Sequence, residues 1–245
     1  MLSVNIDPVL FSIGSIEIRY YGLVYVLGIF LVYFYLKSKG KMSPERIEKL
    51  LFYLVIGMFV GARIFGLLSN NVNFFKDPLE LFRVWNGGMS LFGGFFGGLI
   101  GAWLVLRDKI FEVGDQVVVP ISFVLILGRL ANFINQELVG TVSDVGWCFN
   151  FVTAVGCRHP YQLYSALGHL ILFLIVYIMS KLDLRKGDVF FGFVLGYGIL
   201  RFVTAFFKER FELILGLSIW QVLGVVFILV GIVWFVKRKS AETGI

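Results

Sequence analysis

The chain has 245 residues, of which 58% are hydrophobic and 16% are charged, with 2 cysteines and a net charge of +6. Soluble domains are about 45–50% apolar and about 25% charged, so this composition excludes an ordinary soluble domain, a disordered chain and a disulfide-rich scaffold. The mean hydropathy of +0.87 predicts an integral membrane protein. The excess positive charge then indicates either cytoplasmic loops or a nucleic-acid partner.

Seven segments are long and apolar enough, or nearly so, to cross a bilayer. In chain order we expect them at about 20–36, 50–68, 87–106, 116–134, 161–180, 188–207 and 213–236. The sequence therefore predicts an all-α, polytopic membrane protein in which residues 1–245 form a single transmembrane domain. The first 15 residues contain no Lys or Arg, so no N-terminal signal peptide is expected.

The positions of the cations predict the orientation of these segments. With the N-terminus outside, thirteen of the 22 Lys and Arg residues fall in inner loops and five in outer segments. The loop 37–49 contributes most to this difference. The positive-inside rule then predicts an N-out, C-in topology, and no nucleic-acid partner is needed to explain the charge.

Four cations remain, at the edge of the apolar segments or inside them. Arg19 lies at the outer edge of the first segment, whereas Arg63, Arg129 and Arg201 each lie 13 residues beyond the expected inner end of a segment. This spacing puts the last three about 20 Å above the inner edge, where an unpaired charge costs several kcal/mol. Either they bind an anion such as a phosphate headgroup, or each pairs with a carbonyl or carboxylate that holds helices together.

The third segment is rich in glycine. Gly87 and Gly88 lie at its expected outer entrance, where their backbone amides could approach a headgroup. Gly93, Gly97 and Gly101 follow at a spacing of four residues, which is typical of close helix packing.

Polar residues cluster at the outer end of the fourth segment. Arg129, Asn132 and Gln136 follow an i, i+3, i+7 pattern and are expected to share one helix face. Asn135 and Glu137 flank them. Because interhelical hydrogen bonds contribute only about 0.6–2 kcal/mol, so many amides and charges indicate a polar pocket that opens to the outer surface.

The sixth segment also combines a cation with a polar neighbour. Tyr197 and Arg201 are four residues apart on one helix face, so a phenol and a guanidinium can contact the same ligand. The alternative is that the two side chains only pack against each other.

The cysteines and histidines leave further alternatives open. Cys148 and Cys157 lie nine positions apart in the outer loop 135–160, where they can form a disulfide or remain free thiols. His159 and His169 are the only histidines, and we interpret His169 as a packing residue inside the fifth segment. Because no ligand cluster accompanies them, neither a metal site nor a cofactor is expected.

Several of these motifs, in this order, resemble those of the prolipoprotein diacylglyceryl transferase family. The matching motifs are Asp7-Pro8-Val9, Tyr21-Gly22-Leu23-Val24-Tyr25, Gly61-Ala62-Arg63, Gly87-Gly88-Met89-Ser90, Gly128-Arg129-Leu130-Ala131-Asn132-Phe133-Ile134-Asn135, Arg158-His159-Pro160, Gln162-Leu163-Tyr164 and Tyr197-Gly198 with Arg201-Phe202. The resemblance covers most of the chain. It implies seven transmembrane helices in the cell membrane, and the depth of the three arginines predicts a site toward the outer leaflet.

The resemblance also implies an activity. Family members transfer diacylglyceryl from phosphatidylglycerol to the lipobox cysteine thiol of a preprolipoprotein, forming a thioether and releasing glycerol-1-phosphate. The implied partners are phosphatidylglycerol, preprolipoproteins and membrane lipids. The predicted catalytic residues are Arg129, Arg201, Tyr197 and Glu137. The predicted substrate-binding residues are Tyr21, Asn132 and Gly140 from the resemblance, with Asn135, Arg63, Gly87 and Gly88 from the patterns above.

Asp115 also matches a family aspartate, but its position argues against a place in the outer site. It lies 14 residues before Arg129, or about 21 Å away along a straight helix. We therefore predict that Asp115 is a cap or structural partner at the inner end.

Two residues depart from the family pattern. Phe92 stands where the family has a histidine, and Thr141 where it usually has an arginine. Without that histidine, Glu137, Tyr197, the substrate phosphate or water can accept the thiol proton. The same departures support an alternative function, in which the chain is a non-catalytic or divergent lipid-binding or lipid-transport protein that keeps the headgroup pocket.

Overall fold

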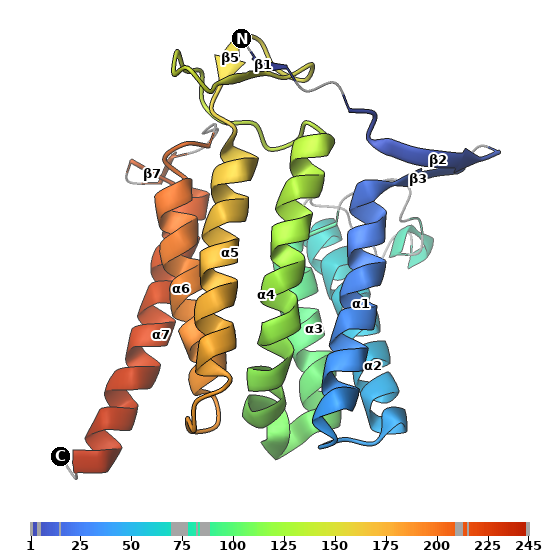
Figure 1. Ribbon diagram of the computed structural model, residues 1–245. Coiled ribbons are helices and arrows are strands. Elements are labelled where there is room, and N and C mark those ends of the chain that lie inside the picture. Colours follow the sequence, from blue (N-terminus) through green and yellow to red (C-terminus); the bar gives the residue numbers. More distant parts are fainter. Residues whose placement is uncertain are drawn as a thin grey trace. The chain divides into compact units, whose positions relative to one another are not determined.

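The computed structural model describes residues 2–3, 6–14, 16–69, 78–81, 83, 89–208, 213–214 and 216–243 (Figure 1). The chain divides into two compact units. One consists of Tyr33–Val113, and the other of Met1–Val32 together with Gly114–Ile245.

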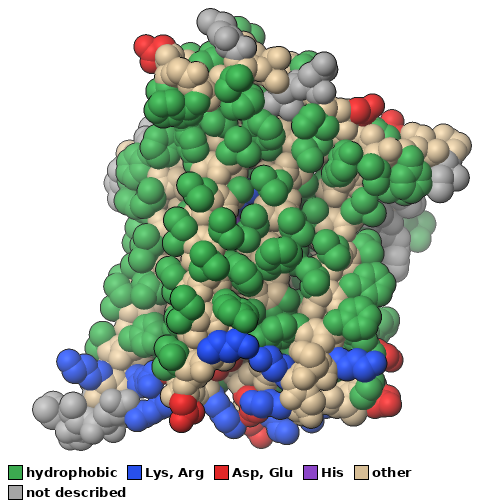
Figure 2. Space-filling model, in the orientation of Figure 1, with side chains coloured by type: hydrophobic (Ala, Val, Ile, Leu, Met, Phe, Trp, Pro, Cys, Tyr) green, Lys and Arg blue, Asp and Glu red, His purple; other side chains and the backbone are tan. Residues whose placement is uncertain are grey.

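Seven α-helices make up most of the described chain. They are α1 (Tyr20–Lys39), α2 (Pro44–Ser69), α3 (Leu91–Leu106), α4 (Ile110–Ile134), α5 (Tyr161–Met179), α6 (Asp188–Thr204) and α7 (Ile219–Thr243). Five described segments are long and apolar enough to cross a membrane: Tyr20–Lys39, Pro44–Leu68, Gly93–Ile134, Tyr161–Met179 and Ile219–Lys239. Hydrophobic side chains cover most of the face drawn in Figure 2. The predicted class of a helical, polytopic membrane protein is confirmed.

Short strands and 3₁₀ turns lie in the connections. The strands are β1 (Leu2–Ser3), β2 (Val9–Ile13), β3 (Ile16–Arg19), β4 (Phe149–Asn150), β5 (Cys157–Arg158), β6 (Leu213–Ile214) and β7 (Leu217–Ser218), and the 3₁₀ turns are η1 (Pro78–Leu81) and η3 (Arg107–Lys109). The strands pair as β1-β4-β5, β2-β3 and β6-β7. Gly14 and Gly216, with φ of 61° and 78°, allow the tight turns of the last two hairpins.

Two helices begin six residues before the positions expected from hydropathy. At the start of α2, Ser43 Oγ accepts a hydrogen bond from Arg46 N, and Pro44 occupies the first helical position, where proline is favoured. At the start of α4, Glu112 lies in the first turn, where the helix dipole stabilises a carboxylate. The expected starts at 50 and 116 were wrong because both helices extend into polar sequence, which a cap supports in α2 and the helix dipole in α4.

Three other helix boundaries differ from the expected positions by three to six residues. The third helix starts later, because Ser90 Oγ caps it by accepting a hydrogen bond from Gly93 N. The seventh starts later, because described residues before it form the β6–β7 hairpin. The sixth ends earlier, since the chain turns after Thr204 and Lys208 pairs with Gly140 in an isolated β-bridge.

The ends of the first and fifth helices lie close to their expected positions. α1 continues three residues farther, with Lys37 and Lys39 in a last turn where the helix dipole favours cations. Gly40, with a φ of 64°, then ends the helix. α5 matches its expected segment to within one residue.

Within the unit 33–113, α2 and α3 pack through their glycines. A Cβ atom added to Gly57 would collide with the carbonyl of Gly97, and one added to Gly61 would collide with the carbonyl of Gly93. Only glycine permits this backbone approach, so the predicted close packing of the third segment is confirmed.

In the other unit, α5, α6 and α7 lie side by side (Figure 1). A Cβ atom on Gly198 of α6 would lie 2.8 Å from the carbonyl oxygen of Gly224 on α7. Asp115 of α4 accepts hydrogen bonds from Gly187 N and Phe190 N at the start of α6. The prediction that Asp115 is a cap is therefore confirmed.

Candidate functional site

A chain of polar side chains lies at the C-terminal end of α4. Arg129 Nη1 donates to Asn132 Oδ1 at 3.4 Å, and Asn132 Nδ2 donates to Glu137 Oε2 at 3.3 Å. Asn135 Nδ2 donates to the other Glu137 oxygen at 3.1 Å. The Glu137 carboxylate thus holds both amides and orients Arg129 through Asn132. The structure brings these four predicted site residues together.

Gln136 does not belong to this group, and its expected place on the Arg129 face was wrong. α4 ends at Ile134, and Gln136 has a φ of 55°, so the helical pattern stops before it. Its side-chain oxygen accepts from Val152 N at 2.7 Å, and its carbonyl accepts from Thr153 Oγ1 at 2.6 Å. Gln136 instead holds the following loop.

Gly140 lies buried where three segments meet. A Cβ atom there would collide with the carbonyl of His159 and lie 2.8 Å from the carbonyl oxygen of Phe207. Its own carbonyl accepts from Arg158 Nη1 at 3.1 Å. The need for glycine at this predicted site residue is therefore explained by close backbone contact.

The second arginine of the site lies near the C-terminal end of α6. Arg201 is 8% exposed, and its Nη1 donates to the Tyr161 hydroxyl at 3.4 Å. Its guanidinium carbon lies 5.9 Å from the centre of the Tyr197 ring and 4.7 Å from that of Trp220. The predicted pairing of Tyr197 with Arg201 on one face is confirmed, and Tyr161 and Trp220 complete the surroundings.

A lysine that the sequence did not single out joins the arginines. Lys208 is 7% exposed, and its Nζ lies 4.1 Å from the centre of the Trp220 ring, which Arg201 also contacts. Burial, together with the positive charges of Arg201 and Arg129, lowers the pKa of Lys208 to about 8. We call Arg129, Arg201 and Lys208 the cation cluster.

Among the described residues, no carboxylate forms an ion pair with the cation cluster. Within the described part of the chain, no carboxylate oxygen lies within 4.0 Å of the charged nitrogens of Arg129, Arg201 or Lys208. Arg201 and Lys208 are buried and Arg129 is partly buried, and cations in such a site without paired carboxylates are stabilised by an anionic ligand. The arrangement therefore fits a phosphate group, which arginine binds through bidentate hydrogen bonds.

His169 lies next to this cluster, fully buried in α5. Its Nδ1 is 2.6 Å from the carbonyl oxygen of Ser165, which can only accept, so this geometry assigns the hydrogen to Nδ1. In the neutral ring Nε2 is then an acceptor, and it has no hydrogen-bond partner among the described residues. The ring meets Tyr197 edge-on at 5.8 Å, and Arg129 and Arg201 interact with it electrostatically. Packing alone does not explain this acceptor.

Tyr21 contributes from α1. Its hydroxyl accepts a hydrogen bond from the Tyr25 hydroxyl at 2.8 Å, and the Tyr25 hydroxyl interacts electrostatically with Glu137 and Arg129. An apolar groove of about 460 Å³ lies between α1 and α4 and ends on α4 beside Arg129. The predicted residue Tyr21 thus lies on an element that borders the polar group.

The unit 33–113 contains the third arginine. Arg63 is 2% exposed, and its Nη2 donates to the Glu80 carbonyl at 2.6 Å, to Glu80 Oε1 at 3.1 Å and to the Arg83 carbonyl at 2.9 Å. These contacts agree with the alternative in which an arginine holds elements together. A substrate role for Arg63 stays a prediction. Gly87, Gly88 and the side chain of Phe92 lie outside the described residues.

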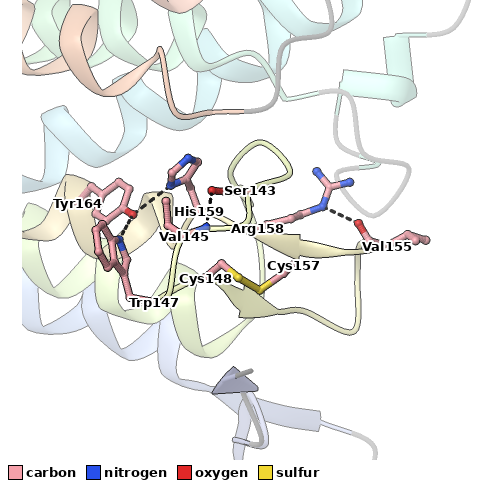
Figure 3. Close-up of a disulfide and its surroundings, with 9 residues drawn as sticks. All are labelled: Ser143, Val145, Trp147, Cys148, Val155, Cys157, Arg158, His159 and Tyr164. Carbon is pink, nitrogen blue, oxygen red and sulfur yellow. Dashed lines mark hydrogen bonds between the residues drawn. A yellow bond between two sulfur atoms is a disulfide. The ribbon is translucent and has the colours of Figure 1, made fainter.

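The loop after α4 is closed by a disulfide (Figure 3). Cys148 and Cys157 are bonded, with 5.5 Å between their Cα atoms, which answers the question that the sequence left open. Beside the disulfide, Trp147 Nε1 donates to the Tyr164 hydroxyl at 2.7 Å, and this hydroxyl lies 3.1 Å from His159 Nδ1. His159 is therefore part of a network that ties the loop to the start of α5.

The chain is similar to known proteins over nearly its whole length. A family model described as prolipoprotein diacylglyceryl transferase matches residues 8–237. The phosphatidylglycerol–prolipoprotein diacylglyceryl transferase of Pseudoalteromonas atlantica is 39% identical, over 98% of this chain and 94% of that protein. Proteins of the same name from Geobacter sulfurreducens and Legionella pneumophila are 40% and 36% identical, over 84% and 96% of this chain and 83% and 98% of their own lengths.

Proposed function

The chain belongs to the prolipoprotein diacylglyceryl transferase family, and from this premise we propose that it transfers diacylglyceryl from phosphatidylglycerol to the lipobox cysteine of preprolipoproteins. In this reaction the cysteine sulfur forms a bond to the glyceryl carbon while that carbon's bond to the phosphate oxygen breaks. Glycerol-1-phosphate leaves with the bonding electrons, and the thiol proton passes to a base. The names of the relatives give no support to the alternative of a lipid-transport protein.

We place the chain in the cell membrane as a single transmembrane domain, with seven membrane-spanning helices, N-out and C-in. The distribution of Lys and Arg between the predicted loops supports this orientation. The C-terminal ends of α4 and α6, which carry Arg129 and Arg201, then face the outer leaflet. This is the side on which a lipobox cysteine of an exported protein becomes accessible.

The observation that carries the proposal is the cation cluster without ion-paired carboxylates among the described residues. The phosphate gains negative charge as its bond to the glyceryl carbon breaks. Preorganised cations in a water-poor site stabilise this charge more strongly in the transition state than in the bound lipid. Arg129 and Arg201 are the catalytic residues in this mechanism, and Lys208 strengthens their field.

Two groups around the cluster position it. Glu137 fixes the Asn132 amide, and Asn132 in turn accepts from Arg129, so the guanidinium is oriented before the lipid arrives. On α5, the Tyr161 hydroxyl accepts a hydrogen bond from Nη1 of Arg201 on α6. We assign binding of the headgroup to Asn132 and Asn135, and orientation of the glycerol to Tyr21 and Tyr197.

The thiol proton requires an acceptor, because the thiolate is the nucleophile. Phe92 replaces the family histidine, which leaves Glu137, Tyr197, the phosphate and water from the sequence. His169 adds a fifth candidate, since its Nε2 is an acceptor without a partner among the described side chains and backbone groups.

The acyl chains need an apolar surface that reaches the headgroup. The groove between α1 and α4 is lined by hydrophobic side chains and by Leu127, Leu130 and Ile134 on the α4 side. These residues alternate along α4 with Arg129 and Asn132, so headgroup and acyl chains can bind to neighbouring faces of one helix. We propose this groove as the acyl-chain site of the substrate.

The test is mass spectrometry of a lipobox peptide after incubation of the purified protein with phosphatidylglycerol. We expect a mass gain of one diacylglyceryl group on the cysteine. Phosphatidylcholine as the only lipid, and a peptide with serine in place of the cysteine, are the controls and should give no gain. No modification of the peptide by folded protein would contradict the proposed activity.

A further inference from the structure

A second groove lies at the other end of α6, between that helix and α7. It has a volume of about 730 Å³. Phe191 in its wall precedes Arg201 by ten residues on α6, so the groove lies about 15 Å from the cation cluster along the helix. It is therefore separate from the proposed headgroup site.

One end of the groove is strongly basic. Arg185 and Lys186 reach it from the connection before α6, and Lys237 and Arg238 from the last turns of α7. Asp188 is the only acidic residue among those that line it, against four basic ones. In Figure 2, Lys and Arg side chains gather around the described end of α7, at the lower left.

The rest of the groove is apolar. Val230, Val233 and Trp234 line it from α7, at positions that share a helix face. Phe191 lines it from α6, and its ring stacks on that of Trp234 with 4.1 Å between the ring centres. Cations at one end and a hydrophobic wall along two membrane helices are the two halves of a site for an amphiphile.

The base of the groove is held by a buried carboxylate. Asp188 is 1% exposed, accepts from Trp234 Nε1 at 3.1 Å and from Arg185 N at 3.2 Å, and is ion-paired with Arg238. These contacts fix Trp234 and Arg238 with respect to the start of α6. Because the Asp188 charge is used within the protein, it does not repel an anion at the basic end.

We propose that this groove binds an anionic phospholipid, with the phosphodiester at Arg185, Lys186 and Lys237 and an acyl chain against Val230 and Val233. Basic pockets between membrane helices bind anionic headgroups, and each Lys or Arg near the surface contributes about 1 kcal/mol. A zwitterionic headgroup carries a cation of its own, which these basic side chains repel. A soluble anion such as inorganic phosphate leaves the apolar wall unused.

The test measures the affinity of purified protein in detergent for phosphatidylglycerol and phosphatidylcholine, by native mass spectrometry at increasing lipid concentration. The wild-type protein should bind one phosphatidylglycerol at this groove in preference to phosphatidylcholine. Lys186→Gln with Lys237→Gln should weaken that binding roughly 25-fold, or about fivefold for each charge removed. The matched control is Lys109→Gln with Lys181→Gln, which removes two exposed cations that do not line the groove.

A second variant tests the apolar half. Val233→Trp fills the wall while every charge stays, so lipid binding should weaken here as well, whereas binding of inorganic phosphate alone would be unchanged. Equal loss in the control and groove variants would overturn the proposal, because net charge would then explain the affinity. Equal binding of the two lipids by the wild-type protein would also overturn it. So would competition for the groove by an acidic peptide and not by phosphatidylglycerol. None of these variants touches the proposed catalytic residues, so a failed lipidation assay has no bearing on the outcome.

Discussion

Asp115 of α4 caps the N-terminus of α6, where its carboxylate oxygens accept hydrogen bonds from Gly187 N at 2.6 Å and from Phe190 N at 2.8 Å. The first backbone N–H groups of a helix have no partner within the helix, and the helix dipole favours a negative charge at this end. Two helices that are far apart in sequence are joined in this way. The cap fixes the start of the helix that carries Tyr197 and Arg201.

Replacing Asp115 should therefore lower stability without removing a group that contacts substrate. We expect Asp115→Ala to lower the free energy of unfolding by about 1–2 kcal/mol, which is the usual cost of losing a capping side chain. Thermal unfolding in detergent measures the change, and Asp108→Ala, an exposed acidic residue of η3, is the control. An unchanged midpoint in Asp115→Ala would show that the cap contributes little.

The cation cluster makes a prediction about activity. Arg129→Ala and Arg201→Ala should each lower kcat for lipidation at least about 100-fold, because each removes a charge that stabilises the leaving phosphate. Lysine should not restore full activity, since it lacks the planar bidentate geometry of a guanidinium. Arg19→Ala is the control, as Arg19 is exposed and paired with Glu17. Full lipidation by either cluster variant, at wild-type protein levels, is incompatible with a role in catalysis.

Lys208 predicts a pH dependence with a defined sign. Burial holds its pKa at about 8 rather than the usual 10.5, so the amine loses its charge as the pH rises through 8. Since kcat/KM reports on the free enzyme, kcat/KM for phosphatidylglycerol should fall between pH 7 and pH 9.5. The kcat/KM of Lys208→Arg should not change over this pH range, because a guanidinium keeps its proton. A parallel fall in both proteins would assign the pH dependence to another group.

The lowered pKa of Lys208 also makes the stability of the fold depend on pH, and stability should rise with pH where kcat/KM falls. The unfolded chain binds the Lys208 proton more tightly than the folded chain does, so this group destabilises the fold below pH 8. That cost decreases as the pH rises from 8 toward 10.5. Lys208→Met should therefore gain stability at pH 7 relative to the wild-type protein, and the gain should shrink at pH 10. Unfolding midpoints at the two pH values provide the measurement.

The disulfide predicts sensitivity to reduction. Cross-linking Cys148 and Cys157 closes a short loop next to the network of Trp147, Tyr164 and His159. Removing a disulfide of this kind costs about 2–4 kcal/mol. We expect Cys148→Ser with Cys157→Ser to unfold at a lower temperature than the oxidised protein and to be unaffected by a thiol reductant. If reductant lowers the midpoint of this variant as well, the effect does not come from the disulfide.

Much of the fold could be predicted because hydrophobic segments of membrane length are a strong signal. The starts of α2 and α3 could not be predicted from hydropathy. They depend on the Ser43 and Ser90 side chains, which accept hydrogen bonds from backbone N–H groups of the first turn. The Arg129, Asn132 and Glu137 group was predictable because it lies within nine residues of sequence. Lys208 was not, since its approach to Arg201 depends on how the chain turns after α6.

His169 shows the same limit for a buried group, because sequence alone cannot reveal which ring nitrogen is satisfied. Its Nδ1 is bonded to the Ser165 carbonyl, and its Nε2 is an acceptor without a partner among the described residues. If this nitrogen takes the thiol proton, His169→Gln should lower kcat about 100-fold or more with little change in KM, since general bases contribute about 10²–10⁴.

Phe92 offers the complementary experiment, since the family resemblance predicts a histidine where this chain has Phe92. Adding Phe92→His to the His169→Gln protein should restore part of kcat and shift the pH profile toward the titration of the new imidazole. Phe92→Tyr in the same background is the control, because it adds a polar group that is not a base at neutral pH. An unchanged kcat in His169→Gln itself would exclude His169 and leave Glu137, Tyr197, the phosphate or water as the acceptor. A merely structural defect at His169 would lower stability and would not be relieved by a base introduced at position 92.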